Sequence, residues 1–222
     1  MTDIAKNLES IQSVLGPSVT LVAVSKTKPA SDIREAYEAG HRDFGENKIQ
    51  EMTEKSDELP SDIQWHMIGH VQTNKIKYMA PFVHLIHGCD REKVLKIADK
   101  EGRKNDRKLK VLLQVHIAEE STKFGFSAEE LREFIESKRW EGYEFIEIKG
   151  LMGMATNTDD KAQVEREFKM LKALYDEVKS VLGDSIDTLS MGMSGDYAIA
   201  INAGSNMVRI GSAIFGARNY PA

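Results

Sequence analysis

Lys26 stands directly after an apolar, β-branched run, VTLVAVS at residues 19–25. Such a run is typical of a buried strand. A lysine at the end of that strand keeps its aliphatic stem among core residues, and partial desolvation lowers the pKa of its amine. A neutral amine is the nucleophile that attacks an aldehyde and forms a Schiff base. The alternative is an ordinary lysine whose head group reaches water.

Serine–glycine pairs follow two other strand-like runs. Ser194-Gly195 and Gly211-Ser212 each lie where a strand gives way to the next segment. Such turns present backbone N–H groups beside a hydroxyl, a combination that suits an anion. Each pair alone is a weak signal, but the loops after the last two strands of a barrel are the usual phosphate site. Pyridoxal 5′-phosphate (PLP) needs both an amine and an anion site, so the two features together favour it.

The segments that must position these residues alternate regularly along the chain. Helix-like segments separate the strand-like ones. The expected strands are 19–25, 41–45, 63–68, 83–87, 109–117, 144–149, 187–191 and 207–210. The expected helices are 3–15, 31–40, 47–58, 73–80, 91–104, 127–138, 160–182 and 195–203. Eight strand–helix units behind one leading helix predict an α/β fold, a (β/α)₈ TIM barrel with an extra N-terminal helix. A doubly wound open sheet is the alternative, because periodicity does not reveal closure.

Composition sets the protein class. The chain has 222 residues, 41% hydrophobic and 29% charged, as in an ordinary soluble protein. No linker, repeat or low-complexity tract divides it, so we expect a single domain over 1–222. A net charge of -5 argues against a general nucleic-acid binder. One cysteine allows no intrachain disulfide, and no secretory signal or membrane span is recognisable, so a cytoplasmic location is expected.

The motifs resemble one family when they are taken together. The stretches that carry the resemblance are LVAVSKTKPASDIREAYEAGHRDFGENKIQE, WHMIGHVQTNK, GLM, LSMGMSGD and MVRIGSAIFGAR, in that order from Leu21 to Arg218. They are similar to the YggS/PROSC family of pyridoxal-phosphate homeostasis proteins, whose fold resembles the barrel domain of alanine racemase. The resemblance implies a Schiff base between PLP and Lys26. It also implies Asn47 against the cofactor, Arg209 facing the pyridine nitrogen, and a phosphate held by Ser194, Gly195, Gly211 and Ser212.

The same resemblance bears on activity. A guanidinium cannot accept a proton and stays charged, so Arg209 disfavours a protonated pyridinium and weakens the ring as an electron sink. Alanine racemase also needs a second domain with a tyrosine base, for which this chain has no room. The expected role is therefore PLP binding and homeostasis without an established turnover. PLP-dependent apo-enzymes are the candidate protein partners, and a monomer is expected.

Several residues at strand ends depart from the family pattern. They are His70, His87, Cys89, His116, Gly153 and Tyr197. One interpretation is drift or packing. A second is a modified or designed pocket, a hydrolase or esterase in which Cys89 pairs with His116, His87 or His66 as nucleophile and base. A third is a metal site of His66, His87, His116 and Cys89, ligands that suit zinc. The carboxylates Glu46, Glu119, Glu120 and Glu147 are scattered and are interpreted as solvated charges.

Overall fold

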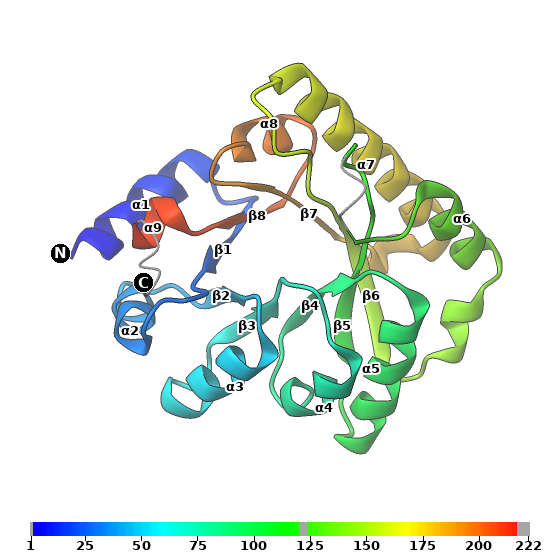
Figure 1. The fold of residues 1–222 in the computed structure, drawn as a ribbon, viewed down its shortest axis with the longest axis horizontal. Coiled ribbons are helices and arrows are strands. Elements are labelled where there is room, and N and C mark those ends of the chain that lie inside the picture. The colour runs from blue at the N-terminus through cyan, green and yellow to red at the C-terminus, as the bar shows by residue number, and fades with distance from the viewer. Residues whose placement is uncertain (1, 120–123, 217–222) are drawn as a thin grey trace.

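The alternating segments of the chain close into a barrel (Figure 1). The structure is a computed structural model, and it describes residues 2–119 and 124–216. All eight strands are parallel, and β8 pairs back onto β1. The strands are β1 (Thr20–Val24), β2 (Asp43–Glu46), β3 (Gln64–Met67), β4 (Leu85–Cys89), β5 (Leu109–Gln114), β6 (Ile146–Met152), β7 (Thr188–Met193) and β8 (Met207–Ile210). The predicted closed barrel is confirmed, and the open-sheet alternative is wrong.

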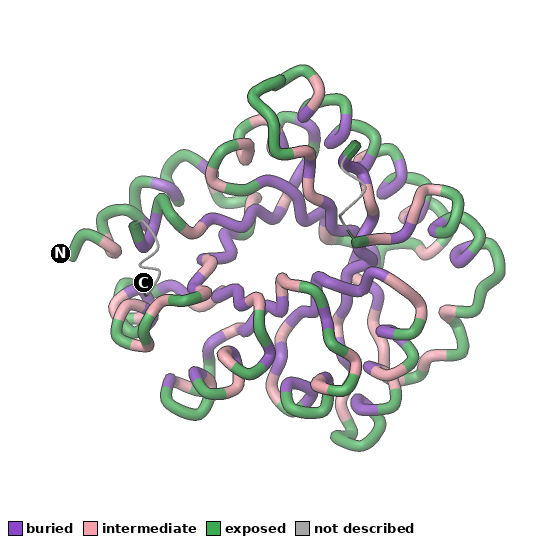
Figure 2. The backbone as a smooth tube through the Cα atoms, viewed as in Figure 1, coloured by how far each residue is buried: buried purple, intermediate pink, exposed green. Residues whose placement is uncertain are grey.

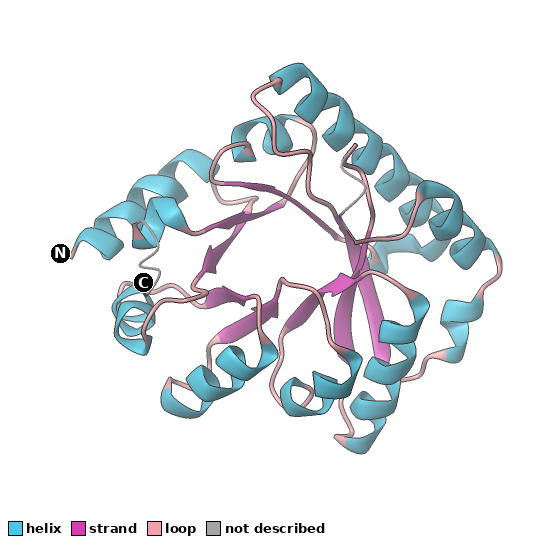
Figure 3. Ribbon diagram, viewed as in Figure 1, coloured by secondary structure: helices cyan, strands magenta, loops and turns pink. Residues whose placement is uncertain are grey.

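Helices form a layer outside the strands (Figure 3). The predicted N-terminal helix is present as α1 (Asp3–Leu15), and the Thr2 hydroxyl accepts from the Ala5 N–H at its start. The others are α2 (Ala30–Glu38), α3 (Ile49–Glu58), α4 (Ile76–Met79), α5 (Glu92–Lys104), α6 (Ala128–Glu136), α7 (Lys161–Leu182), α8 (Tyr197–Asn202) and α9 (Ser212–Phe215). Helix α1 lies beside α9 in Figure 1, where the Asn7 side chain donates to the Ile214 carbonyl over 3.0 Å.

Several predicted elements have different bounds. The expected strand 109–117 ends at Gln114, and Val115 forms an isolated bridge with Phe126. The expected helix 73–80 is a 3₁₀ turn at 73–75 followed by α4, and the expected strand 144–149 runs as β6 to Met152. Helix α9 has only four residues, too few for a recognisable hydrophobic period, and the sequence did not indicate it.

Two apolar regions hold the strands in place. Successive side chains of a strand point to opposite faces, and β1, β4, β5, β6 and β8 contribute to both regions. A small cluster belongs to one face of the strands, and its buried members are Val22, Leu85, Leu112, Met152 and Met207. A much larger cluster joins the strands to the helices, and Figure 2 shows buried backbone along the barrel wall. Because both faces are packed, the strand ends have fixed positions from which loops can present functional groups. In the described parts of the chain, no helix has the length and apolarity to cross a membrane.

Candidate cofactor-binding site

A cavity of about 400 Å³ lies among the loops that follow the strands. Lys26 comes after β1, Asn47 after β2, and Ser194 and Gly195 after β7. Arg209 belongs to β8, and Gly211 and Ser212 follow that strand. All seven residues predicted for the cofactor line this one cavity, namely Lys26, Asn47, Ser194, Gly195, Arg209, Gly211 and Ser212. The structure therefore brings together residues that are up to 186 positions apart in the chain (212 minus 26).

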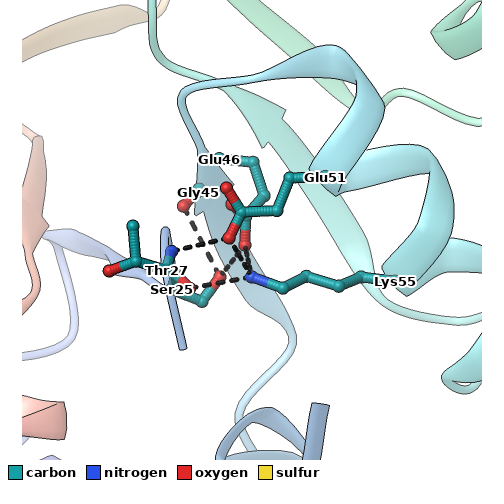
Figure 4. A network of polar contacts seen from close by, with 6 residues as sticks. All are labelled: Ser25, Thr27, Gly45, Glu46, Glu51 and Lys55. Atoms are coloured by element: carbon teal, nitrogen blue, oxygen red, sulfur yellow. Dashed lines mark hydrogen bonds and ion pairs between the residues drawn. The ribbon is translucent and has the colours of Figure 1, made fainter. Parts of the chain in front are cut away.

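The backbone on both sides of Lys26 is fixed by one group of polar contacts outside the barrel wall. Figure 4 shows this group, which we call the anchor network: Ser25, Thr27, Glu46, Glu51 and Lys55. The Lys55 ammonium donates to the Ser25 carbonyl at 2.9 Å and to one carboxylate oxygen each of Glu46 and Glu51 at 2.8 Å. The Ser25 hydroxyl donates to Glu46, and the Thr27 N–H donates to Glu51, both over 2.6 Å. The network thus grips the residue before Lys26 and the residue after it.

Charge in the anchor network is unbalanced, with two carboxylates around one ammonium. Glu46 is fully buried, and its second oxygen has no hydrogen-bond partner within the described chain. Burial raises the pKa of Glu46 to about 7, although the nearby Lys55 charge acts in the opposite direction. Interpreting Glu46 as a solvated charge was wrong. Glu119 is exposed and Glu147 half-buried, whereas Glu120 lies outside the described residues.

Arg209 reaches the cavity from the buried side. Its guanidinium donates to the Ser190 carbonyl at 2.9 Å, to the Ser190 hydroxyl at 2.6 Å and to the Gly153 carbonyl at 3.1 Å. Burial lowers the pKa of Arg209 to about 10, so the group remains charged at neutral pH. A fixed cation at this position can face an acceptor atom of a bound ring but cannot take a proton from it.

The loops after β7 and β8 meet at the cavity, where both contribute lining residues. The Ser212 hydroxyl lies 3.4 Å from that of Ser194, so the two hydroxyls form a pair. Lys28 donates to the Phe215 carbonyl over 2.6 Å and ties the end of α9 to the loop after β1. Two hydroxyls with adjacent glycine backbone make a group of donors for an anion such as phosphate.

Close backbone contacts form the wall beside Asn47. A Cβ atom on Gly69 would lie 2.4 Å from the Asn47 carbonyl oxygen, and one on Gly88 would lie 2.3 Å from the Gly69 carbonyl oxygen. Real Cβ atoms do not approach so closely, and the obstacles are backbone atoms that have no rotamer to change. The loop after β2, the loop after β3 and strand β4 can therefore pack this closely only because both positions are glycine.

Sequence reasoning did not assign the part of the cavity wall that the His70 and Phe124 rings form. The His70 and Phe124 rings have centroids 4.2 Å apart at 31°, and His70 Nδ1 lies 2.8 Å from an Asp90 carboxylate oxygen. Gln114 donates to the Phe124 carbonyl at 2.8 Å and lines the same cavity. His70 stood out only as a departure from the family pattern. Nothing in the sequence links it to Phe124, which lies in a loop 54 positions later (124 minus 70).

The thiol alternative has little physical support. Cys89 is fully buried in the large apolar cluster, and burial raises the pKa of its thiol well above the ordinary value. A thiol in that environment stays protonated and is a poor nucleophile. Cys89 is not among the described residues that line the cavity.

The other unusual residues have separate locations. His87 is buried, the backbone N–H of His116 donates to the Phe126 carbonyl, and Tyr197 packs partly buried against the core. The ring nitrogens of His66 and His87 already have hydrogen-bond partners. Across residues 2–119 and 124–216, no group of three or more His, Cys, Asp or Glu side chains is arranged to hold a metal ion.

The fold and the cavity define a class: a (β/α)₈ barrel with a lysine, a buried arginine and paired serines at one mouth. Residues 1–219 match the alanine racemase N-terminal domain family. The pyridoxal phosphate homeostasis protein of Pasteurella multocida is 39% identical over 227 residues, covering 99% of this chain and 97% of that protein. The one from Haemophilus influenzae is 42% identical over 207 residues, covering 91% and 86%. The chain therefore belongs to the alanine racemase N-terminal domain family, among its pyridoxal phosphate homeostasis proteins.

A solved structure adds a likeness in three dimensions. PipY of Synechococcus elongatus PCC7942, in its structure with PLP bound, superposes with a TM-score of 0.87 at 33% identity. The superposition covers 96% of this chain and 100% of that one.

Proposed function

We propose that this chain binds PLP and acts in its homeostasis, with the cofactor attached covalently to Lys26. The observation that carries the proposal is the single cavity lined by all seven predicted residues. Relatives named pyridoxal phosphate homeostasis protein, and a related structure that contains PLP, support the choice of ligand. We also propose that residues 1–222 form one domain, since every described strand belongs to the same barrel.

The residues present fit the chemical needs of the cofactor. The aldehyde of PLP supplies an electrophile, and Lys26 is the primary amine that lines the cavity. Ser194, Gly195, Gly211 and Ser212 would hold the phosphate through hydroxyl and backbone donors. Asn47 would contact the cofactor from the β2 loop, and Arg209 would face the pyridine nitrogen.

Arg209 favours holding the cofactor over turning over a substrate. A charged, donor-only group at the pyridine nitrogen opposes protonation there. The ring then withdraws electrons less strongly than it would beside a carboxylate. We therefore propose a carrier or buffering role in the cytoplasm for a monomeric protein, with PLP-dependent apo-enzymes as recipients and no nucleic-acid or membrane partner.

The test is the visible spectrum of purified protein before and after PLP is added, followed by borohydride. We expect a yellow adduct that borohydride fixes covalently. Lys26→Ala should abolish it, and so should Lys26→Arg, which keeps the charge but lacks the nucleophile. Circular dichroism checks that both variants fold. A fixed adduct that survives in Lys26→Ala would move the attachment to another amine and contradict the proposal.

A further inference from the structure

A row of polar side chains extends from the start of β2 to the cavity through the buried part of the barrel. We call it the interior column: Asp43, His66, His87, Ser190 and Arg209. Asp43 lies 3.0 Å from His66 Nε2, His66 Nδ1 lies 2.9 Å from His87 Nε2, and His87 Nδ1 lies 3.1 Å from the Ser190 hydroxyl. Arg209 completes the row with its 2.6 Å contact to that hydroxyl.

The column is buried along almost its whole length. His66, His87 and Ser190 have no exposed surface, and Arg209 is 4% exposed. Only the Asp43 end has access to solvent, since its side chain is 25% exposed. Buried polar groups are tolerated where every donor faces an acceptor, so each contact along the row must join one donor to one acceptor.

The two ends of the column determine that order. A carboxylate only accepts hydrogen bonds and a guanidinium only donates them. Burial raises the pKa of Asp43, but the hydrogen bond from His66 acts in the opposite direction, and the pKa is lowered on balance, so the group is ionised. His66 must then donate from Nε2 to Asp43. In its neutral form it accepts at Nδ1, so His87 donates from its own Nε2.

The remaining links follow from the His87 tautomer. Burial, together with the nearby charges, lowers the pKa of His87 well below its usual value, so its ring is neutral. Its Nδ1 is therefore an acceptor for the Ser190 O–H. The Ser190 oxygen then offers a lone pair to Arg209. Each group in the row donates to the next one in a single direction, from Arg209 to Asp43.

We propose that this directed row is a positioning device for Arg209, in which Ser190, His87 and His66 act through their neighbours on the guanidinium that faces the cavity. The proposal rests on the proposed function only where the cofactor is concerned. The order of the hydrogens is a property of the protein by itself. Ser190 is the decisive member, because it is the only one in contact with both His87 and Arg209.

The first experiment needs no cofactor. Long-range ¹H–¹⁵N correlation spectra of the histidine rings report which nitrogen carries the proton, and His66→Gln and His87→Gln variants assign the signals. We expect His66 and His87 each to carry a ring proton at Nε2, with Nδ1 as the acceptor in both rings. A proton on His87 Nδ1 would reverse the direction of the hydrogen bond between His87 and Ser190 and would overturn the proposal.

The second experiment asks whether Arg209 responds. Ser190→Ala removes the hydroxyl that accepts from Arg209, and Ser205→Ala is the matched control. Ser205 is also a buried serine beside β7 and β8, but its hydroxyl contacts the Leu189, Met191 and Met207 carbonyls instead. We expect Ser190→Ala to weaken PLP binding about tenfold and to shift the visible band, while Ser205→Ala leaves the band in place.

The outcomes separate the two proposals. An unchanged band and affinity in Ser190→Ala would reject the positioning role even if PLP binds. Equal shifts in both serine variants would also reject it, because they would indicate a general loss of packing. If the parent protein fails to bind PLP, the proposed function fails, and the histidine spectra alone decide whether the directed row exists.

Discussion

The anchor network and the interior column reach the same cavity by different physical means. The anchor network lies outside the barrel wall and holds the residues beside Lys26 through Lys55, Glu46 and Glu51. One Glu46 oxygen is buried without a hydrogen-bond partner among the residues that the structure describes. The interior column places its charges at its two ends and neutral groups between them. Charge can be kept out of water only when it is paired, whereas neutral hydrogen-bonded rows carry a smaller desolvation penalty. We therefore expect the lysine side of the cavity to depend more strongly on mutation and on pH than the arginine side.

The largest effect should follow loss of the central cation of the anchor network. Lys55→Met leaves two carboxylates close together without a counter-charge, at a position where the native lysine side chain is only 9% exposed. We expect a loss of about 3–5 kcal/mol in the free energy of unfolding, measured by urea denaturation. Lys172→Met is the control, because its pair with Asp176 lies on the surface of α7. It should change stability by at most about 1 kcal/mol. Equal effects of the two variants would show that the anchor network contributes no more than a surface pair.

A smaller effect should appear as a pH dependence. Because burial raises the pKa of Glu46 from 4.5 to about 7, the folded state binds more protons than the unfolded state between these values. The contribution of Glu46 to stability is therefore fully present below pH 4.5 and is lost as the pH rises through 7. Glu46→Gln should flatten the fall in stability across this window in denaturation curves at several pH values. A slope that persists unchanged in Glu46→Gln would assign it to other groups.

The smallest effect concerns the residue after Lys26. Thr27 has φ +63, a left-handed conformation that is unusual for a residue with a branched side chain. Thr27→Gly relieves this strain but increases the freedom of the unfolded chain, and it keeps the N–H that donates to Glu51. We expect stability to change by no more than about 1 kcal/mol and PLP binding to stay the same. A large loss of binding would mean that the threonine side chain itself contributes to the cavity.

Sequence reasoning located the ends of the cavity better than its surroundings. The position of Lys26 at the cavity could be predicted because the residue directly follows an apolar strand, and functional groups of a barrel gather where strands end. Ser194 and Ser212 could be predicted because their turns follow the last two strands of a barrel. Asn47 and Arg209 came from the family resemblance alone. For all seven predicted residues that line the cavity, contact with a cofactor stays a prediction.

The contacts of the anchor network and the interior column could not be predicted from the sequence, because they join residues that are far apart in the chain. Glu46 and Lys55 belong to different elements, and nothing in the pattern of charges shows that the first carboxylate is buried. His66 and His87 were interpreted as possible metal ligands or bases. Pairing within the interior column was missed because it depends on two side chains from β3 and β4 meeting inside the barrel.

The stacked glycines at positions 69 and 88 have a practical consequence for anyone who wishes to alter ligand preference. A side chain at either glycine would meet neighbouring main chain, so no substitution at these two positions can change the cavity without displacing the backbone. Redesign has to work from the side chains opposite. Met154 and Phe124 are two positions to substitute, since both line the cavity and neither belongs to the anchor network or the interior column.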